Sequence, residues 1–109
     1  MLDVFNRASQ RLLAAGAGVE QGRILHSQGL KTGGKFFGFV TGDDLVVKVP
    51  AARVQELIEG GAGAPFDAGK GRPMKEWVRL HPDDAATCWA YLDEARAFVS
   101  ALGQRVSGT

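Results

Sequence analysis

The clearest pattern in the chain is a pair of apolar-rich runs, 34–41 and 44–49, on either side of Gly42 and Asp43. Gly in the first position of a two-residue loop favours the type II′ turn that joins antiparallel strands. The sequence therefore predicts a β-hairpin over 34–49. Counting outward from the turn gives the facing pairs: Thr41 with Asp44, Val40 with Leu45, Gly38 with Val47 and Phe36 with Val49.

The two faces of this hairpin differ in character. One face carries only apolar side chains and a glycine, and we predict that it faces the core. The other face is too apolar for an ordinary solvated surface, yet its lysine makes it too charged for full burial. Its residues are Phe37, Phe39, Val46 and Lys48. We predict that this second face stays open and serves as an interaction surface.

Three segments have the apolar spacing of amphipathic helices. They are Leu2–Ala15, the stretch after Pro50 that ends at Gly60, and the stretch after Asp84 that ends at Gly103. Proline suits the first turn of a helix, acidic residues suit its N-terminus, and glycine commonly follows its end.

Alternating residues predict further strands before and after the hairpin. They are Arg23–Leu30, a short edge strand around Phe66, and Lys75–Leu80. The predicted order is helix, three strands, helix, two strands, helix. This order is typical of an α+β two-layer domain, an antiparallel sheet with helices on one face.

Composition supports one soluble domain over residues 1–109, in which 1–21 form an N-terminal helix and loop and 103–109 a flexible tail. The net charge of +1 gives no electrostatic reason to expect a polyanion or an anionic membrane as the main partner. A single cysteine excludes an internal disulfide, and the sequence has neither a signal segment nor an apolar run long enough to span a bilayer. We therefore expect a cytoplasmic protein that makes no membrane contact.

Candidate catalytic and cofactor motifs are weak. The stretch Ala64–Gly71 lacks the first glycine and the hydroxyl of a phosphate-binding loop, and the glycines near Gly16 follow a helix instead of a strand. Four nucleophile or base candidates have simpler interpretations: His26 and Ser27 point to opposite faces of a strand, His81 lies in a surface loop, and Cys88 is a small buried apolar residue. We predict no enzyme activity, no cofactor and no metal.

One basic cluster follows the glycine-rich loop and adjoins the hairpin. It contains Lys70, Arg72, Lys75 and Arg79, with Lys35 and Lys48 on the hairpin. Phenylalanine interleaved with lysine and arginine on a sheet is the arrangement that single-stranded nucleic-acid readers use. The alternative is a solvated basic edge offset by Asp67 and Glu76, and the near-zero net charge favours it.

Several short segments, in their order and spacing, resemble the TfoX/Sxy N-terminal domain family. They are Gly34–Val40, Asp44–Val49, Gly63–Phe66, Gly71–Met74 and the terminal helix with Trp89. The resemblance spans about 22–102 and implies a two-layer α+β fold like that of secretion chaperones. It departs from the family at Ile24–Ser27, where the family has a Met-Phe-Gly-Gly type segment. It brings no catalytic residue with it, and we do not carry over the competence role because those regulators have a second domain.

Our leading hypothesis is a regulatory or adaptor domain that acts through contacts with an unidentified protein partner. The candidate interaction surface combines the second hairpin face with the basic cluster: Phe37, Phe39, Val46, Lys48, Lys70, Arg72 and Lys75. Weak nucleic-acid binding and small-molecule binding are the alternatives, and an open sheet face leaves a homodimer as a further hypothesis.

Overall fold

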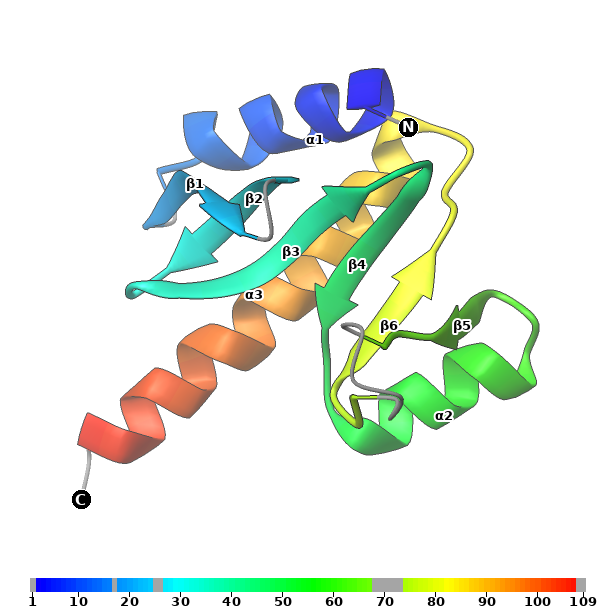
Figure 1. Ribbon diagram of the computed structural model, residues 1–109. Helices are drawn as coiled ribbons and strands as arrows, with labels where there is room; N and C mark the ends of the chain where they lie inside the picture. Colours follow the sequence, from blue (N-terminus) through cyan, green and yellow to red (C-terminus); the bar gives the residue numbers. More distant parts are fainter. Residues whose placement is uncertain (1, 17, 25–26, 68–73, 108–109) are drawn as a thin grey trace.

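The computed structural model describes residues 2–16, 18–24, 27–67 and 74–107 of the chain (Figure 1). Its elements, in chain order, are α1 (Leu2–Ala14), β1 (Val19–Ile24), β2 (Ser27–Thr32), β3 (Lys35–Thr41), β4 (Asp44–Lys48), α2 (Ala51–Glu59), β5 (Gly63–Pro65), β6 (Trp77–Leu80) and α3 (Ala85–Ser107). The strands form one antiparallel sheet in the order β1-β2-β3-β4-β6-β5, and α3 runs diagonally behind β3 and β4 (Figure 1). The predicted α+β two-layer class is confirmed.

The structure has four strands before α2, where the sequence predicted three. The segment Arg23–Leu30, predicted as one strand, contains the end of β1 and most of β2, which pair in a hairpin with Ile24 opposite Ser27. The two residues between them, 25 and 26, lie outside the described residues. The prediction missed β1 because this edge strand has the polar sequence VEQGRI and shows little apolar alternation.

The predicted register of the central hairpin is confirmed, with Thr41 opposite Asp44, Val40 opposite Leu45 and Gly38 opposite Val47. Gly42 has φ +57°, the positive value that the first position of such a turn requires. The predicted pair of Phe36 with Val49 lies beyond the β3–β4 ladder, which starts at Gly38.

A β-bulge in β3 explains why the register prediction fails beyond Gly38. Leu30 of β2 faces Gly38, but the next residue, Lys31, faces Phe36, so Phe37 is an extra residue in β3. Such an insertion shifts the side-chain alternation by one position. Phe37 consequently points to the helix side and Phe36 to the opposite side, the reverse of the prediction.

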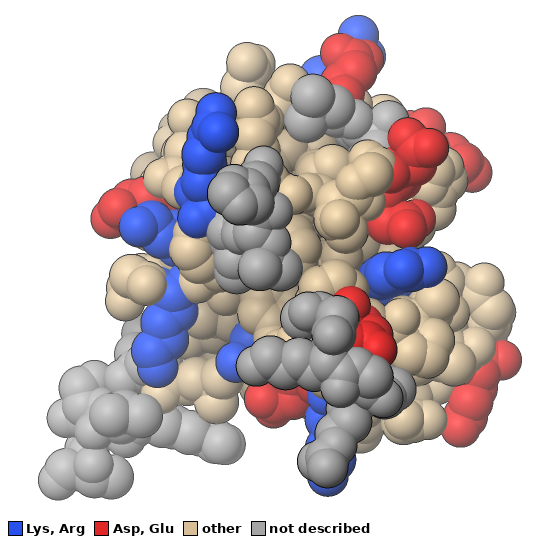
Figure 2. All heavy atoms as spheres, in the orientation of Figure 1, with Lys and Arg blue, Asp and Glu red and all other residues tan. Residues whose placement is uncertain are grey.

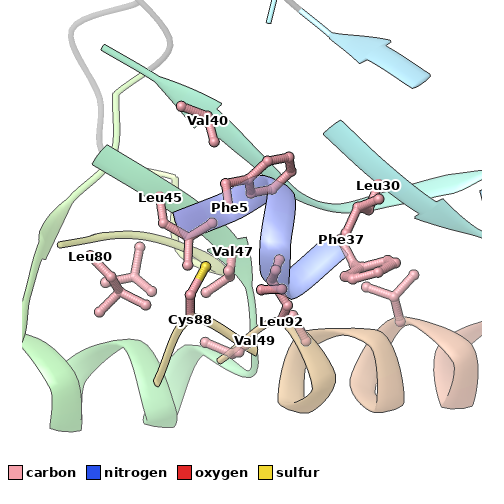
Figure 3. Close-up of a cluster of buried hydrophobic side chains, with 14 of the residues drawn as sticks. Phe5, Leu30, Phe37, Val40, Leu45, Val47, Val49, Leu80, Cys88 and Leu92 are labelled. Carbon is pink, nitrogen blue, oxygen red and sulfur yellow. The ribbon is translucent and has the colours of Figure 1, made fainter. Parts of the chain in front are cut away.

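The main core lies between the sheet and the helices (Figure 3). Helix α3 contributes the buried series Cys88, Leu92, Ala95 and Val99, whose spacing matches one helix face. The other members come from β2, β3, β4, β6 and both other helices, and Val49 directly follows β4: Phe5, Ala8, Leu12, Leu30, Phe37, Val40, Leu45, Val47, Val49, Val54, Leu57, Val78 and Leu80. At the closest approach of sheet and helix, a Cβ on Gly38 would lie 2.6 Å from Cδ2 of Leu92.

Polar contacts hold the helices in place around this core. The Arg53 guanidinium of α2 donates to Glu94 of α3 at 2.8 Å, and this hydrogen bond raises the pKa of Arg53. At the start of α3, the backbone N–H of Thr87 donates to Oδ1 of Asp84 at 2.7 Å, so Asp84 caps the helix as its acidic sequence predicted. The predicted end of α3 at Gly103 is wrong, since the helix continues to Ser107. A single glycine costs a helix only about 1 kcal/mol.

A candidate docking groove beside helix α2

The centre of the outer face of the sheet, opposite α3, is covered by the chain itself. Phe39 and Val46 are 1% and 0% exposed, and they form a second cluster with Phe66, against which Trp77 packs. The Phe39 ring centroid lies 5.5 Å from that of Phe66 and 5.6 Å from that of Trp77. The backbone N–H of Met74 donates to the carbonyl of Phe66 at 2.8 Å, which holds these two residues together.

The prediction that Phe37, Phe39 and Val46 form an open surface is therefore wrong. Phe37 belongs to the main core because of the β-bulge, and the other two lie beneath Phe66 and Trp77. The sequence prediction failed because residues that follow β5 in the chain supply the cover. The homodimer hypothesis was based on the same face and stays a hypothesis.

The basic members of the predicted surface have different positions. Lys48 is half-buried, and its Nζ lies 5.8 Å from the centroid of the Trp77 ring, while Lys75 is exposed. Lys70 and Arg72 lie outside the described residues, as does the second half of the Ala64–Gly71 stretch. Figure 2 shows Lys and Arg side chains along the left and centre of one side and most Asp and Glu toward the right, so this side is not uniformly cationic.

Lys48 and Lys75 come together at a groove beside α2. One hollow of about 500 Å³ lies between the exposed side of α2, Pro65 of β5 and Met74. A second of about 490 Å³ continues from Ala51 past Lys48 to Trp77. The two hollows share Ala51, Met74 and Lys75, and we refer to them together as the α2 groove.

The lining of the α2 groove is mostly apolar. Met74 is 40% exposed, and among the described residues it is the only large apolar side chain with such a high exposed fraction. Small side chains at Ala51 and Ala52 leave the space open in front of Val54 and Ile58. An exposed methionine beside a hollow is typical of surfaces that adapt to a bound apolar group.

The charges around the α2 groove are mainly positive. Lys48 and Lys75 have no carboxylate within 4.0 Å among the described residues, and Glu76 is the one acidic residue in the lining. Helix α2 has no acidic residue in its first turn, so the positive end of its dipole is not offset there. A negatively charged group in this groove would therefore be stabilised.

Sequence reasoning missed the groove itself, although it selected two of its lysines. Met74 appeared only as part of the family pattern, and Ala51 and Ala52 appeared only as the start of a helix. The available signal was the pair of small residues on the first turn of an amphipathic helix. That signal indicates open space only when the facing segment, Pro65 and Met74, is known.

Among the described residues, the other chemical candidates lie in separate places. His81 lies in the β6–α3 connection, as predicted, with Nδ1 3.7 Å from Oδ1 of Asp44, and Arg79 Nε lies 3.6 Å from the same carboxylate. Cys88 is fully buried, as predicted, and burial raises the pKa of its thiol to about 11. His26 lies outside the described residues.

Among the described residues, His, Cys, Asp and Glu form no group of three or more arranged to hold a metal ion. Within the same residues, no helix combines the length and the apolar character needed to cross a membrane. Comparisons with protein-family models, with curated proteins and with solved structures found no match to this chain. The resemblance to TfoX/Sxy N-terminal domains therefore stays a prediction made from short sequence segments.

Proposed function

We propose that this chain is a non-enzymatic adaptor domain that holds a short segment of a partner protein in the α2 groove. The observation that carries the proposal is the pair of adjoining hollows, of about 500 and 490 Å³, with exposed Met74 between them and two lysines at their rim that have no carboxylate within 4.0 Å among the described residues. A regulatory role in the cytoplasm agrees with the family resemblance and belongs to the same proposal.

The chemistry of the lining defines the partner segment. Met74, Ile58 and Pro65 favour a large apolar side chain as the anchor, because burying such a side chain contributes about 1.5–3 kcal/mol. Lys48 and Lys75 favour acidic residues beside that anchor. The partner segment is therefore a short peptide with one or two large apolar side chains flanked by aspartate or glutamate.

A direct test is a ¹⁵N NMR titration with the acetylated, amidated hexapeptide Asp-Asp-Leu-Phe-Glu-Asp. Saturable shifts are expected at backbone amides around the groove, above all Ala52, Gln55 and Lys75. The variant A52W should block binding by filling the hollow without changing any charge. Shifts that map to another surface, or an A52W variant that binds as well as the wild type, would overturn the proposal.

A matched pair of charge variants separates a specific groove from general attraction. Lys75→Glu should weaken peptide binding by at least about tenfold, which corresponds to the loss of one good charged contact. Lys35→Glu makes the same charge change at the start of β3 and should leave the affinity unchanged. Equal weakening by both variants would show that only net charge attracts the peptide.

Single-stranded nucleic acid is the second candidate ligand, and one observation favours it. Lys31 Nζ lies 5.7 Å from the Phe36 ring centroid and Lys48 Nζ lies 5.8 Å from that of Trp77, so two rings on the outer face each have a lysine beside them. A fluorescent oligothymidine titrated at low salt should then bind with a steep salt dependence, and Lys31→Glu with Lys48→Glu should reduce that slope. If the oligonucleotide does not bind, this candidate is eliminated. It is also eliminated if the salt dependence of binding changes neither in this double variant nor in the double variant Lys70→Glu with Arg72→Glu.

A further inference from the structure

Another hollow, which we call the α1 hollow, lies at the other end of the sheet, between α1 and the helix-facing side of the β1–β2 hairpin. Its volume is about 330 Å³. Phe5 and Leu30 form its apolar floor, and both are almost completely buried. Four polar side chains surround the floor: Asn6, Gln21, Arg23 and Gln28.

The strand register brings three of these polar residues together. Gln21 faces Leu30 and Arg23 faces Gln28 in the β1–β2 ladder. Directly facing residues in an antiparallel pair share one side of the sheet, as do alternate residues of one strand. Leu30 belongs to the main core, so Gln21, Arg23 and Gln28 all lie on the helix side, where Asn6 of α1 also lines the hollow.

The polar character of this site contrasts with the neighbouring main core, whose members are apolar. Within the described part of the chain, none of the four polar side chains has a hydrogen-bond or ion-pair partner. Among the described residues that line the hollow, Arg23 is the only charged one, so none of them supplies a carboxylate to neutralise it. The hollow thus combines an apolar floor, one free guanidinium and three primary amides.

We propose that this hollow binds a small organic carboxylate whose apolar body lies on Phe5 and Leu30. The guanidinium of Arg23 matches the two oxygens of a carboxylate in a bidentate pair. The amides of Asn6, Gln21 and Gln28 supply further donors and acceptors that orient the ligand. The volume is at the lower end of the roughly 300–1,000 Å³ typical of ligand sites, which restricts the ligand to a small molecule.

The chemistry favours a carboxylate over a phosphate. One guanidinium balances the single charge of a carboxylate, whereas a phosphate dianion would be left half-neutralised above an apolar floor. A neutral ligand of the same shape would leave Arg23 without a partner. The site is therefore expected to rank a carboxylate first, its neutral amide second and inorganic phosphate last.

The test is an NMR titration of the full chain with phenylacetate, phenylacetamide and inorganic phosphate, each up to roughly 10 mM, well above the ~1 mM dissociation constant of a weak ligand. Phenylacetate should give saturable shifts at the side-chain amides of Asn6, Gln21 and Gln28. The proposal is overturned if phenylacetate gives no saturable shifts or if its shifts map to another surface. It is also overturned if phenylacetamide or phosphate binds as tightly as phenylacetate.

Two variants complete the test. Arg23→Gln should weaken phenylacetate binding by at least about tenfold and should leave phenylacetamide binding nearly unchanged. Arg7→Gln is the matched control, because Arg7 is a strongly exposed arginine on α1 that pairs with Asp3 and does not line the hollow. If both variants weaken phenylacetate equally, general attraction between charges explains the binding and the proposal is wrong. Arg23 is exposed, so its substitution should not prevent folding.

Discussion

The β-bulge in β3 makes a sharp prediction about two adjacent phenylalanines. In a hairpin that alternates strictly, Phe36 would face the core and Phe37 would face outward. In the structure Phe37 is 0% exposed and lies in the core with Leu30 and Leu92 (Figure 3). Phe36 is half-buried on the outer side. Truncating each residue to alanine therefore tests the bulge directly, because the two arrangements predict opposite orders of stability.

The magnitudes follow from the burial of each ring. Phe37→Ala removes a fully buried ring from a packed core, and such changes cost about 3–5 kcal/mol of unfolding free energy. The Phe36 ring lies on the paired Gly22 and Gly29, where a Cβ on either glycine would approach ring atoms to about 3.1 Å. Half-burial of a phenylalanine contributes about 1 kcal/mol. The two variants should thus differ by at least about 2 kcal/mol.

Urea denaturation followed by tryptophan fluorescence and circular dichroism measures both free energies. Trp77 reports on the outer cluster and Trp89 on α3, so coincident transitions check that unfolding is two-state. Phe36→Leu and Phe37→Leu serve as milder controls and should keep the same order. Equal losses for the two alanine variants, or a larger loss for Phe36→Ala, would refute the bulge and support strict alternation.

Three further predictions concern single contacts. Gly38→Ala should lower the unfolding free energy by about 1–3 kcal/mol because the new Cβ would meet Leu92. In a double-mutant cycle, the chain that carries both Gly38→Ala and Leu92→Ala should lose less than the sum of the two single losses. The Cys88 thiol ionises near pH 9 in the unfolded chain and near pH 11 in the native state, so the unfolded state loses its proton first. As the pH rises from 9 to 11, the unfolding free energy of the wild type should therefore decrease by on the order of 2–3 kcal/mol relative to that of Cys88→Ala. Parallel pH profiles for the two proteins would contradict this. Hydrogen bonding from the backbone N–H of Thr87 lowers the pKa of Asp84 below 3.8, so Asp84→Ala should lower the melting temperature at pH 7. This loss should disappear as the pH falls through the lowered pKa, because the wild-type carboxylate is then protonated as well. Asp83→Ala is the control and should show neither effect.

The α2 groove and the α1 hollow lie at opposite ends of the sheet. Helix α2 packs on β5, which is one edge strand, while the hollow lies against β1, which is the other. Because the two sites share no lining residue, A52W should leave carboxylate binding intact and Arg23→Gln should leave peptide binding intact. Failure of one proposal is thus distinguishable from failure of the other.

Local patterns in the sequence determined much of the fold. Helical spacing located all three helices, and the glycine at the hairpin turn fixed the pairing of Val40 with Leu45. The apolar stripe of the last helix identified Cys88 as a core residue. These features depend on neighbours within a few positions of one another, where steric and hydrogen-bonding preferences act without the rest of the fold.

Tertiary structure alone decided which surfaces remain open. Strict alternation contains no information about an extra residue, so only the pairing of β3 with β2 shows that Phe36 and Phe37 exchange faces. Phe39 is buried because Phe66 and Trp77, from distant parts of the chain, lie across it. The same holds for both candidate sites: each is a space between side chains of separate elements. Such a space remains where large side chains of different elements do not pack against one another. A sequence pattern within one element does not specify which side chains of other elements lie opposite it.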